Sequence, residues 1–219
     1  MLSLVKTGVW RCIVFDLDGT VANTIPLIIA SYDHALTTIV GIPADPVQAR
    51  SWIGQTLWDT FTERYPEQVD ALVEAYVEFN LSHLDSEIRR YEGMPELLAE
   101  LTAVGIPIGV ATSKRRHSAE RTLAAVKLEQ LIPLVVAMED TAAHKPNPEP
   151  LRLAVDRLGA RTDHAVYIGD AVVDVQAAAA AGMASIAVTW GAGDRDELIA
   201  AEPTIVVDTI DQLRAALLG

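Results

Sequence analysis

Short apolar runs alternate with segments of helical periodicity along most of this chain, and this alternation limits the possible folds more than any other feature. We predict buried strands at 12–15, 106–112, 134–137, 165–168, 185–188 and 204–207. Runs that are apolar throughout are typical of parallel strands covered on both faces. The alternation with helices therefore predicts an α/β fold built on a doubly wound parallel sheet.

The segment 22–90 interrupts the alternation, because it contains no convincing strand. Residues 25–40 have a helical pattern, with Pro26 in the first turn, where proline is tolerated. Further along, Val69, Val73 and Val77 share one helical face. We therefore expect two domains: an α/β core of residues 1–21 and 91–219, and a small all-helical domain of residues 22–90 inserted after the first strand.

The string Asp16-Leu17-Asp18-Gly19-Thr20 follows the first predicted strand directly. Residues two apart in an extended segment point to the same side, so both carboxylates are expected to face one crevice at the strand's carboxyl end. Open α/β sheets bind their ligands there. Two close carboxylates repel each other unless a cation lies between them, and such oxygen ligands suit Mg²⁺ better than zinc. Taken alone, an Asp-x-Asp pair fits a solvated turn or a helix cap equally well.

Three further polar groups follow predicted strands. Thr112 and Ser113 can donate hydrogen bonds to phosphoryl oxygens, although a helix cap is the simpler interpretation of these two residues alone. Lys145 precedes Pro146, in a segment that the prolines are expected to hold extended, and its ammonium can neutralise an anionic nucleophile and a phosphate. Asp170 and Asp174 lie close to one helical turn apart, so with the first Asp pair they favour a metal site.

Taken together, these motifs are similar to those of the haloacid dehalogenase-like (HAD) phosphohydrolases, in the same order along the chain. The resemblance implies that Asp16 attacks phosphorus and forms an aspartyl-phosphate. It implies that Asp18 protonates the leaving group and then activates the water that hydrolyses this intermediate. Lys145 is expected to balance charge, and the substrate's phosphoryl group is expected to be bound by Thr112, Ser113, Gly19 and Thr20.

The same resemblance implies a Mg²⁺ ion as cofactor. Its expected ligands are Asp16, the backbone carbonyl of Asp18, Asp170 and Asp174. For Asp174 three roles stay open, since it can bind the metal directly, bind it through water, or support Lys145 and the metal without touching the ion.

The helical insertion resembles the small cap found at this place in one large HAD subgroup, where the cap largely sets substrate specificity. Gly54 and Gln55 match the substrate-facing loop of that cap, whereas Trp52 is equally suited to packing the cap on the core. Segments 23–24, 78–80 and 91–93 resemble phosphoglycolate phosphatase-like proteins, a group that includes a bacterial pyrophosphatase. The resemblance thus implies a phosphatase for a small phosphate monoester or anhydride, such as phosphoglycolate or pyrophosphate.

Two other functions share the motifs. A sugar phosphomutase would differ only in protecting the aspartyl-phosphate from water. An inactive binding protein of this fold would normally lack one of the carboxylates or the lysine, and this chain has them all. Nucleotide binding is less favoured, because there is no Gly-x-x-x-x-Gly-Lys-Ser/Thr loop and the segment 191–193 is too short a signal.

Charge and cysteine content limit the partners and the compartment. The chain has 17 basic and 30 acidic residues, a net charge of -13, and such a surface repels nucleic acid and anionic membranes. No run approaches the ~20 apolar residues of a membrane span, and residues 1–10 lack the apolar stretch of a signal peptide. Cys12 is the single cysteine, which fits a reducing compartment. We expect a cytoplasmic monomer or homodimer that binds neither nucleic acid nor membranes.

Overall fold

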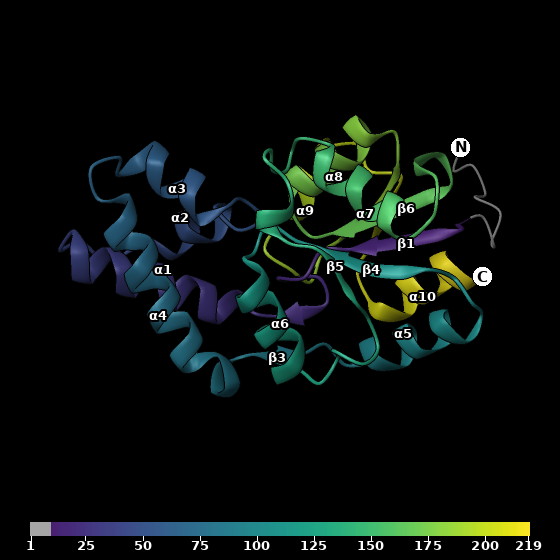
Figure 1. Ribbon diagram of the computed structural model, residues 1–219, viewed down its shortest axis with the longest axis horizontal. Coiled ribbons are helices and arrows are strands. Elements are labelled where there is room, and N and C mark those ends of the chain that lie inside the picture. The colour runs from purple at the N-terminus through teal and green to yellow at the C-terminus, as the bar shows by residue number, and fades with distance from the viewer. Residues whose placement is uncertain (1–9) are drawn as a thin grey trace.

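A six-stranded parallel sheet forms the centre of the molecule (Figure 1), in the strand order β5-β4-β1-β6-β7-β8. The structure is a computed structural model that describes residues 10–219. The strands are β1 (Cys12–Phe15), β4 (Ile108–Ala111), β5 (Leu134–Val136), β6 (Ala165–Gly169), β7 (Ala184–Val188) and β8 (Ile205–Val207). Each lies at one of the predicted runs, and the predicted α/β fold is confirmed.

Helices cover both faces of this sheet, as the doubly wound prediction requires. On one face, Cys12 and Val14 of β1 pack with α7 (Glu149–Arg157) and α8 (Val172–Ala181). On the other face, Ile13 and Phe15 pack with α5 (Met94–Ala103), α6 (Arg116–Ala125) and α10 (Ile210–Leu218). Successive side chains of a strand point to opposite faces, so the all-apolar sequence of β1 supplies both layers. A short helix, α9 (Arg195–Ala200), packs beside α8.

The helical insertion lies beyond one end of the sheet (Figure 1) and has a hydrophobic core of its own. It consists of α1 (Ile25–Ile39), α2 (Pro46–Ser51), α3 (Leu57–Arg64) and α4 (Val69–Glu87). Tyr32 of α1 is at the centre of that core, with its ring 4.9 Å from Tyr76, 5.0 Å from Trp52 and 5.6 Å from Phe61 in edge-on contacts. We refer to residues 22–90 as the cap. The domain boundaries at 21/22 and 90/91 remain a proposal, which this separate core supports.

One expectation about the cap is wrong, because it does contain strand. Two-residue strands, β2 (Ala22–Asn23) and β3 (Arg89–Arg90), pair antiparallel at its two ends. A two-residue strand is too short to show an apolar period, so it left no pattern in the sequence. The pairing brings together the two chain connections between cap and core.

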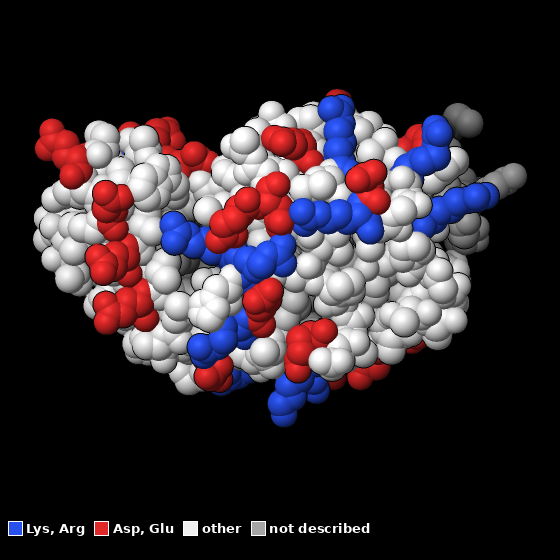
Figure 2. Space-filling view, viewed as in Figure 1, with Lys and Arg blue, Asp and Glu red and all other residues white. Residues whose placement is uncertain are grey.

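The charged surface agrees with the acidic composition. Asp70, Glu74 and Glu78 of α4 are exposed, and Figure 2 shows acidic side chains over the cap end of the molecule and basic ones nearer its middle. Among residues 10–219, no helix combines the length and the apolar composition needed to cross a bilayer. The expectation about residues 1–10 falls almost wholly outside the described part of the chain.

Candidate active site

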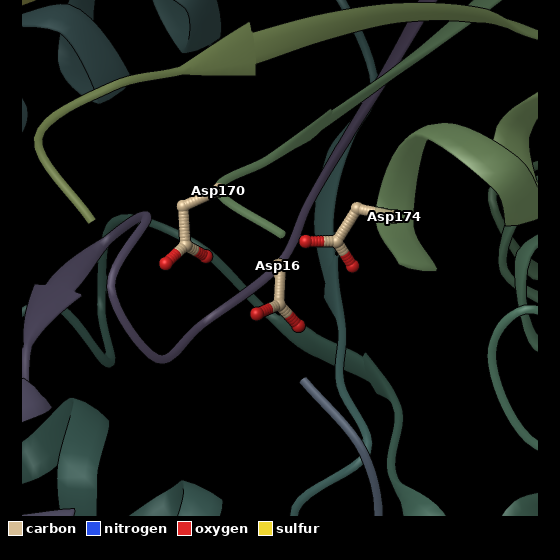
Figure 3. Close-up of side chains that lie close together, drawn as sticks. All are labelled: Asp16, Asp170 and Asp174. Atoms are coloured by element: carbon tan, nitrogen blue, oxygen red, sulfur yellow. The ribbon is translucent and has the colours of Figure 1, made fainter. Parts of the chain in front are cut away.

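Three carboxylates from two adjacent strands and one helix converge at the carboxyl edge of the sheet (Figure 3). Asp16 follows β1 directly, Asp170 follows β6, and Asp174 lies in the first turn of α8. Each offers an oxygen that lies within 4.8 Å of those of the other two, and all three side chains are buried. The Asp16 backbone N–H donates to the Ile168 carbonyl at 2.8 Å, which extends the β1–β6 pairing into the site.

Lys145 is the buried cation of this cluster. Its ammonium donates to Asp16 Oδ1 at 2.8 Å, to Asp174 Oδ1 at 2.6 Å and to the Tyr167 hydroxyl at 3.1 Å. The segment that carries it is a turn rather than the expected extended stretch, closed by a hydrogen bond from the Asn147 N–H to the His144 carbonyl. The turn directs the lysine between two of the three carboxylates.

Tyr167 is a site residue that the sequence analysis did not assign. It lies within β6, fully buried, and its hydroxyl donates to the Ala111 carbonyl at 2.9 Å while accepting from Lys145. A hydroxyl inside an otherwise apolar strand was the available signal, because a buried Tyr O–H needs a partner. Tyr167 thus fixes the position of the lysine between Asp16 and Asp174.

The charges of the cluster fit a divalent metal ion. Three ionised carboxylates and one ammonium leave a formal charge of minus two, which a divalent cation neutralises. Buried like charges at this distance are unfavourable without such a cation, and carboxylate oxygens suit hard ions such as Mg²⁺. Asp18 is not in the group of three, and its carboxylate forms an ion pair with Lys114 at 2.9 Å.

Asp170 is held by two segments of the core, one that follows β1 and one that follows β7. It accepts hydrogen bonds from the Thr20 hydroxyl at 3.0 Å and from the Ala192 N–H at 2.6 Å. Thr20, which is predicted to bind the substrate's phosphoryl group, is fully buried, and its hydroxyl contacts this carboxylate. In the sequence, the segment 191–193 gives only a weak nucleotide-binding signal. In the structure its Ala192 N–H holds Asp170, a residue 22 positions earlier in the chain.

Arg50 connects the cap to that same loop, and the sequence analysis did not assign it either. From α2, its Nε donates to the Ala192 carbonyl at 2.8 Å, and its guanidinium also donates to the Gly191 carbonyl. Because Ala192 donates in turn to Asp170, one chain of hydrogen bonds runs from the cap to the carboxylate cluster.

A cavity between cap and core opens onto the cluster. Its core side contains Asp16, Asp18 and Lys145 together with Thr112 and Ser113, the two predicted phosphoryl ligands. The Lys114 N–H donates to Thr112 Oγ1 at 3.1 Å, so this loop has a defined shape. Five sequence-predicted residues thus lie around one cavity, and the nucleophile candidate Asp16 is one of them.

The cap loop reaches the cavity only in part. Gly54 and Gln55 line it, as expected. Trp52 is buried in the cap core, where the Arg64 guanidinium lies over its ring, so packing rather than ligand contact is its role here. A Cβ at Gly54 would lie 3.0 Å from Val173 and 3.1 Å from Ala171, which shows how closely the cap backbone approaches α8.

Burial and mutual repulsion alter the acidity of the cluster. Burial, reinforced by Asp174 and opposed by Lys145, raises the pKa of Asp16 to about 7. Burial and the neighbouring carboxylates also raise the pKa of Asp170 well above its usual range. Burial acts to lower the pKa of Lys145, but the surrounding Asp16 and Asp174 raise it well above its ordinary value. The ammonium is therefore charged at neutral pH, whereas the carboxylates favour a cation.

Buried acidic groups, a clamped lysine and a hydroxyl-bearing loop at the carboxyl edge of a parallel sheet are features of an α/β hydrolase. Residues 13–188 match the family model of haloacid dehalogenase-like hydrolases. The chain belongs to this family, and the predicted resemblance and hydrolase class are both confirmed.

Individual relatives agree with the assignment. The chain is 35% identical to pyrophosphatase PpaX from Bacillus cereus (strain AH820), over 92% of this chain and 93% of the relative. The crystal structure of a predicted phosphatase from Clostridium acetobutylicum superposes with a TM-score of 0.85 at 27% identity, covering 95% of this chain and 98% of that one. A predicted phosphoglycolate phosphatase from Haemophilus somnus, at 23% identity and a TM-score of 0.81 over 94% and 97% of the two chains, shows the shared fold alone.

Proposed function

We propose that this chain is a Mg²⁺-dependent phosphatase that hydrolyses a small phosphate monoester or anhydride through an aspartyl-phosphate on Asp16. The observation that carries the proposal is the contact of Lys145 with both Asp16 and Asp174, since Lys145 and Asp16 line the same cavity as Thr112 and Ser113. The similarity to a pyrophosphatase supports the same class of reaction. The single cysteine, buried in β1, is consistent with action in the cytoplasm.

The proposed reaction has two displacements at phosphorus. In the first, an Asp16 carboxylate oxygen forms a bond to phosphorus as the bond to the leaving oxygen breaks, and Asp18 gives that oxygen a proton. In the second, Asp18 takes a proton from water, whose oxygen bonds to phosphorus and releases Asp16 and inorganic phosphate. Lys145 keeps the nucleophile in place and offsets negative charge, while Thr112 and Ser113 donate to the phosphoryl oxygens.

The metal proposed for the site is Mg²⁺. Asp16, Asp170 and Asp174 would hold it, together with the Asp18 backbone carbonyl. A bound Mg²⁺ supplies positive charge that lets two anions approach each other.

Measurement of phosphate release tests this function. Purified protein with Mg²⁺ is assayed against phosphoglycolate, pyrophosphate, sugar phosphates, nucleotides and simple alkyl phosphates, with Asp16→Asn as the inactive control. We expect Mg²⁺-dependent phosphate release that EDTA abolishes. Conversion of glucose 1-phosphate to glucose 6-phosphate without phosphate release would identify a phosphomutase instead, and inactivity across the whole panel would contradict the proposal.

Replacement of Gly19 by alanine is expected to weaken metal binding by about 10–100-fold. Gly19 has a φ of +80°, and a Cβ there would lie 2.1 Å from Asp170 Oδ2, so this carboxylate has to move. Calorimetric titration with Mg²⁺ measures the change in affinity directly.

Gly105→Ala is the matched control for this substitution. Gly105 has a similar φ of +75° but has nothing within 4 Å of the added Cβ. Both variants therefore carry the backbone strain of a left-handed alanine, about 1 kcal/mol, whereas only Gly19→Ala disturbs the cluster. Equal Mg²⁺ affinity in the two variants would show that the close approach of the Gly19 backbone to Asp170 does not shape the metal site.

The stabilisation that Mg²⁺ gives should increase with pH up to about pH 7. Because the folded-state pKa values of Asp16 and Asp170 lie above their unfolded values, these groups stabilise the metal-free fold when protonated. This contribution to the stability of the metal-free protein decreases as the pH rises above about 4. The part that comes from Asp16 is lost as the pH passes its folded-state pKa of about 7. Mg²⁺ binds the deprotonated carboxylates, so the stability that it adds is largest at the higher pH, where repulsion among these carboxylates is strongest.

Thermal unfolding at several pH values, with and without Mg²⁺, measures this effect. Samples without Mg²⁺ are adjusted with NaCl to the same ionic strength, which removes the contribution of general screening. A rise in Tm on adding Mg²⁺ that is the same at about pH 5 and about pH 8 would be inconsistent with carboxylates that share a proton-sensitive metal site.

A further inference from the structure

The two walls of the active-site cavity differ in chemistry. Within residues 10–219, every charged side chain that lines the cavity comes from the core: Asp16, Asp18, Lys114, Arg115 and Lys145. The cap contributes eleven lining residues, and none of them is charged. Most are aliphatic or aromatic side chains of α1, α3 and α4, among them Ile28, Trp58, Val73 and Val77.

The apolar wall lies where a leaving group must go. Asp16 is at the carboxyl edge of the sheet, and the cap lies beyond that edge (Figure 1). In an in-line displacement the leaving oxygen departs opposite the attacking one. A phosphoryl group bound at Asp16 by Thr112 and Ser113 therefore directs the remainder of the substrate toward the cap.

Within residues 10–219, the cations that line the cavity all come from core loops, and two of them are already paired with carboxylates. Lys145 is paired with Asp16 and Asp174, and Lys114 is paired with Asp18. Arg115 is exposed and directly precedes α6, in the same loop as Thr112. A second anionic group against the cap wall would therefore lose water without gaining a cation there, which is unfavourable.

The charges of the cap lie elsewhere. The acidic residues Asp70, Glu74 and Glu78 of α4 are exposed and do not line the cavity. The polar groups that the cap does present to the cavity are neutral, for example the amides of Gln55 and Asn80. Neutral amides can hydrogen-bond a hydroxyl but do not neutralise a carboxylate or a phosphate.

We propose that the substrate is a phosphate monoester of an uncharged alcohol with an apolar surface, rather than pyrophosphate or phosphoglycolate. This inference rests on the proposed function, because it takes the phosphoryl site at Asp16 as given. The hydrocarbon of the alcohol packs against Ile28, Val73, Val77 and Trp58, and the burial of that hydrocarbon favours binding.

Binding of two non-hydrolysable phosphonates tests the proposal. 3-Methylbutylphosphonate and 3-phosphonopropionate have nearly the same shape, but the first ends in a branched hydrocarbon and the second in a carboxylate. Calorimetry on the wild-type protein with Mg²⁺ should give a Kd at least about tenfold lower for 3-methylbutylphosphonate, a difference of about 1.4 kcal/mol. Equal affinity, or tighter binding of 3-phosphonopropionate, would overturn the proposal.

Val77→Arg provides the converse test. Val77 is half-buried on α4, so an arginine there can place its charge in the cavity while staying partly solvated. The variant should bind 3-phosphonopropionate about tenfold more tightly than the wild type does. Val77→Leu, the neutral control, should keep the wild-type order of affinities. An affinity of Val77→Arg for 3-phosphonopropionate no higher than that of the wild type would show that the cap wall does not contact the leaving group.

Turnover of the corresponding esters separates this inference from the function on which it rests. Isobutyl phosphate should be hydrolysed with a higher kcat/KM than phosphoglycolate or pyrophosphate. If the phosphonates bind in the expected order but no ester releases phosphate, the proposed function fails while the preference for an apolar group stands. If all three substrates are hydrolysed and pyrophosphate or phosphoglycolate has the higher kcat/KM, the function stands and the inference fails.

Discussion

Replacement of Asp16 by asparagine is expected to lower kcat for phosphate release by about 10⁴-fold or more. The asparagine amide keeps the size of the side chain but cannot form a stable bond to phosphorus. It also removes one of the three carboxylates that lie within 4.8 Å of one another. Steady-state phosphate release at saturating Mg²⁺ measures the loss, and near-normal turnover in Asp16→Asn would rule out the proposed mechanism.

The same variant should fold at least as well as the wild type when no metal is present. Lys145 retains its 2.6 Å contact with Asp174, and one source of repulsion among buried carboxylates is gone. The urea midpoint in EDTA should therefore be unchanged or higher. A large fall in that midpoint would mean that the loss of activity reports misfolding rather than the loss of a nucleophile.

Asp18→Asn separates the two steps of the proposed reaction. Its nucleophile is intact, whereas the group that protonates the leaving group and later activates water is lost. With 4-nitrophenyl phosphate, whose leaving group departs without a proton, phosphate should therefore transfer to Asp16 and remain there. Quenching with acid and measuring bound phosphate by mass spectrometry should show about 80 mass units added to Asp18→Asn and none to Asp16→Asn. Absence of the adduct from both variants would argue against a covalent intermediate.

The features that sequence reasoning predicted are those that depend on residues close together in the chain. The all-apolar run at β1 and the Asp16 that follows it belong to one short segment. The buried strand and the carboxylate at its end can therefore be recognised together. The same holds for β6 and Asp170. Because parallel strands end at the same edge of a sheet, the convergence of Asp16 and Asp170 followed from topology.

The features that were missed depend on contacts between distant segments. Arg50 contacts a carbonyl 142 residues away in the sequence, and no local pattern marks such a partner. Lys114 directly follows the predicted phosphoryl ligands Thr112 and Ser113, but its ion pair with Asp18 joins residues 96 apart. The apolar cap wall was also not anticipated, since the inward direction of Val77 and Ile28 depends on how the cap sits over the core.

Replacement of Lys145 by methionine is expected to cost about 3–5 kcal/mol of unfolding free energy at neutral pH without metal. Methionine fills a similar volume but leaves Asp16 and Asp174 buried without their cation. The lysine is almost fully buried, so water does not replace it. Because Asp16 and Asp174 raise the pKa of Lys145 above its ordinary value, the lysine stays charged and its contribution is complete at neutral pH, and loss of its proton removes that contribution in strong alkali.

Two measurements distinguish this effect from a simple packing defect. Urea unfolding of Lys145→Met should show a smaller deficit at about pH 5, where protonation neutralises the carboxylates, and a smaller deficit with Mg²⁺, which supplies the missing charge. A packing defect would give the same deficit in all these conditions. Lys114→Met, which breaks the more accessible pair with Asp18, should lose less stability.

The double variant Lys145→Met/Asp174→Asn decides between loss of charge balance and loss of a catalytic group. Removing one carboxylate lowers the uncompensated charge, so the double variant should be more stable than Lys145→Met alone, a non-additive result expected of groups in direct contact. Its activity should not recover, because Asp16 still lacks the ammonium that lies 2.8 Å away in the wild type. Recovery of turnover together with stability would show that Lys145 acts only through the fold.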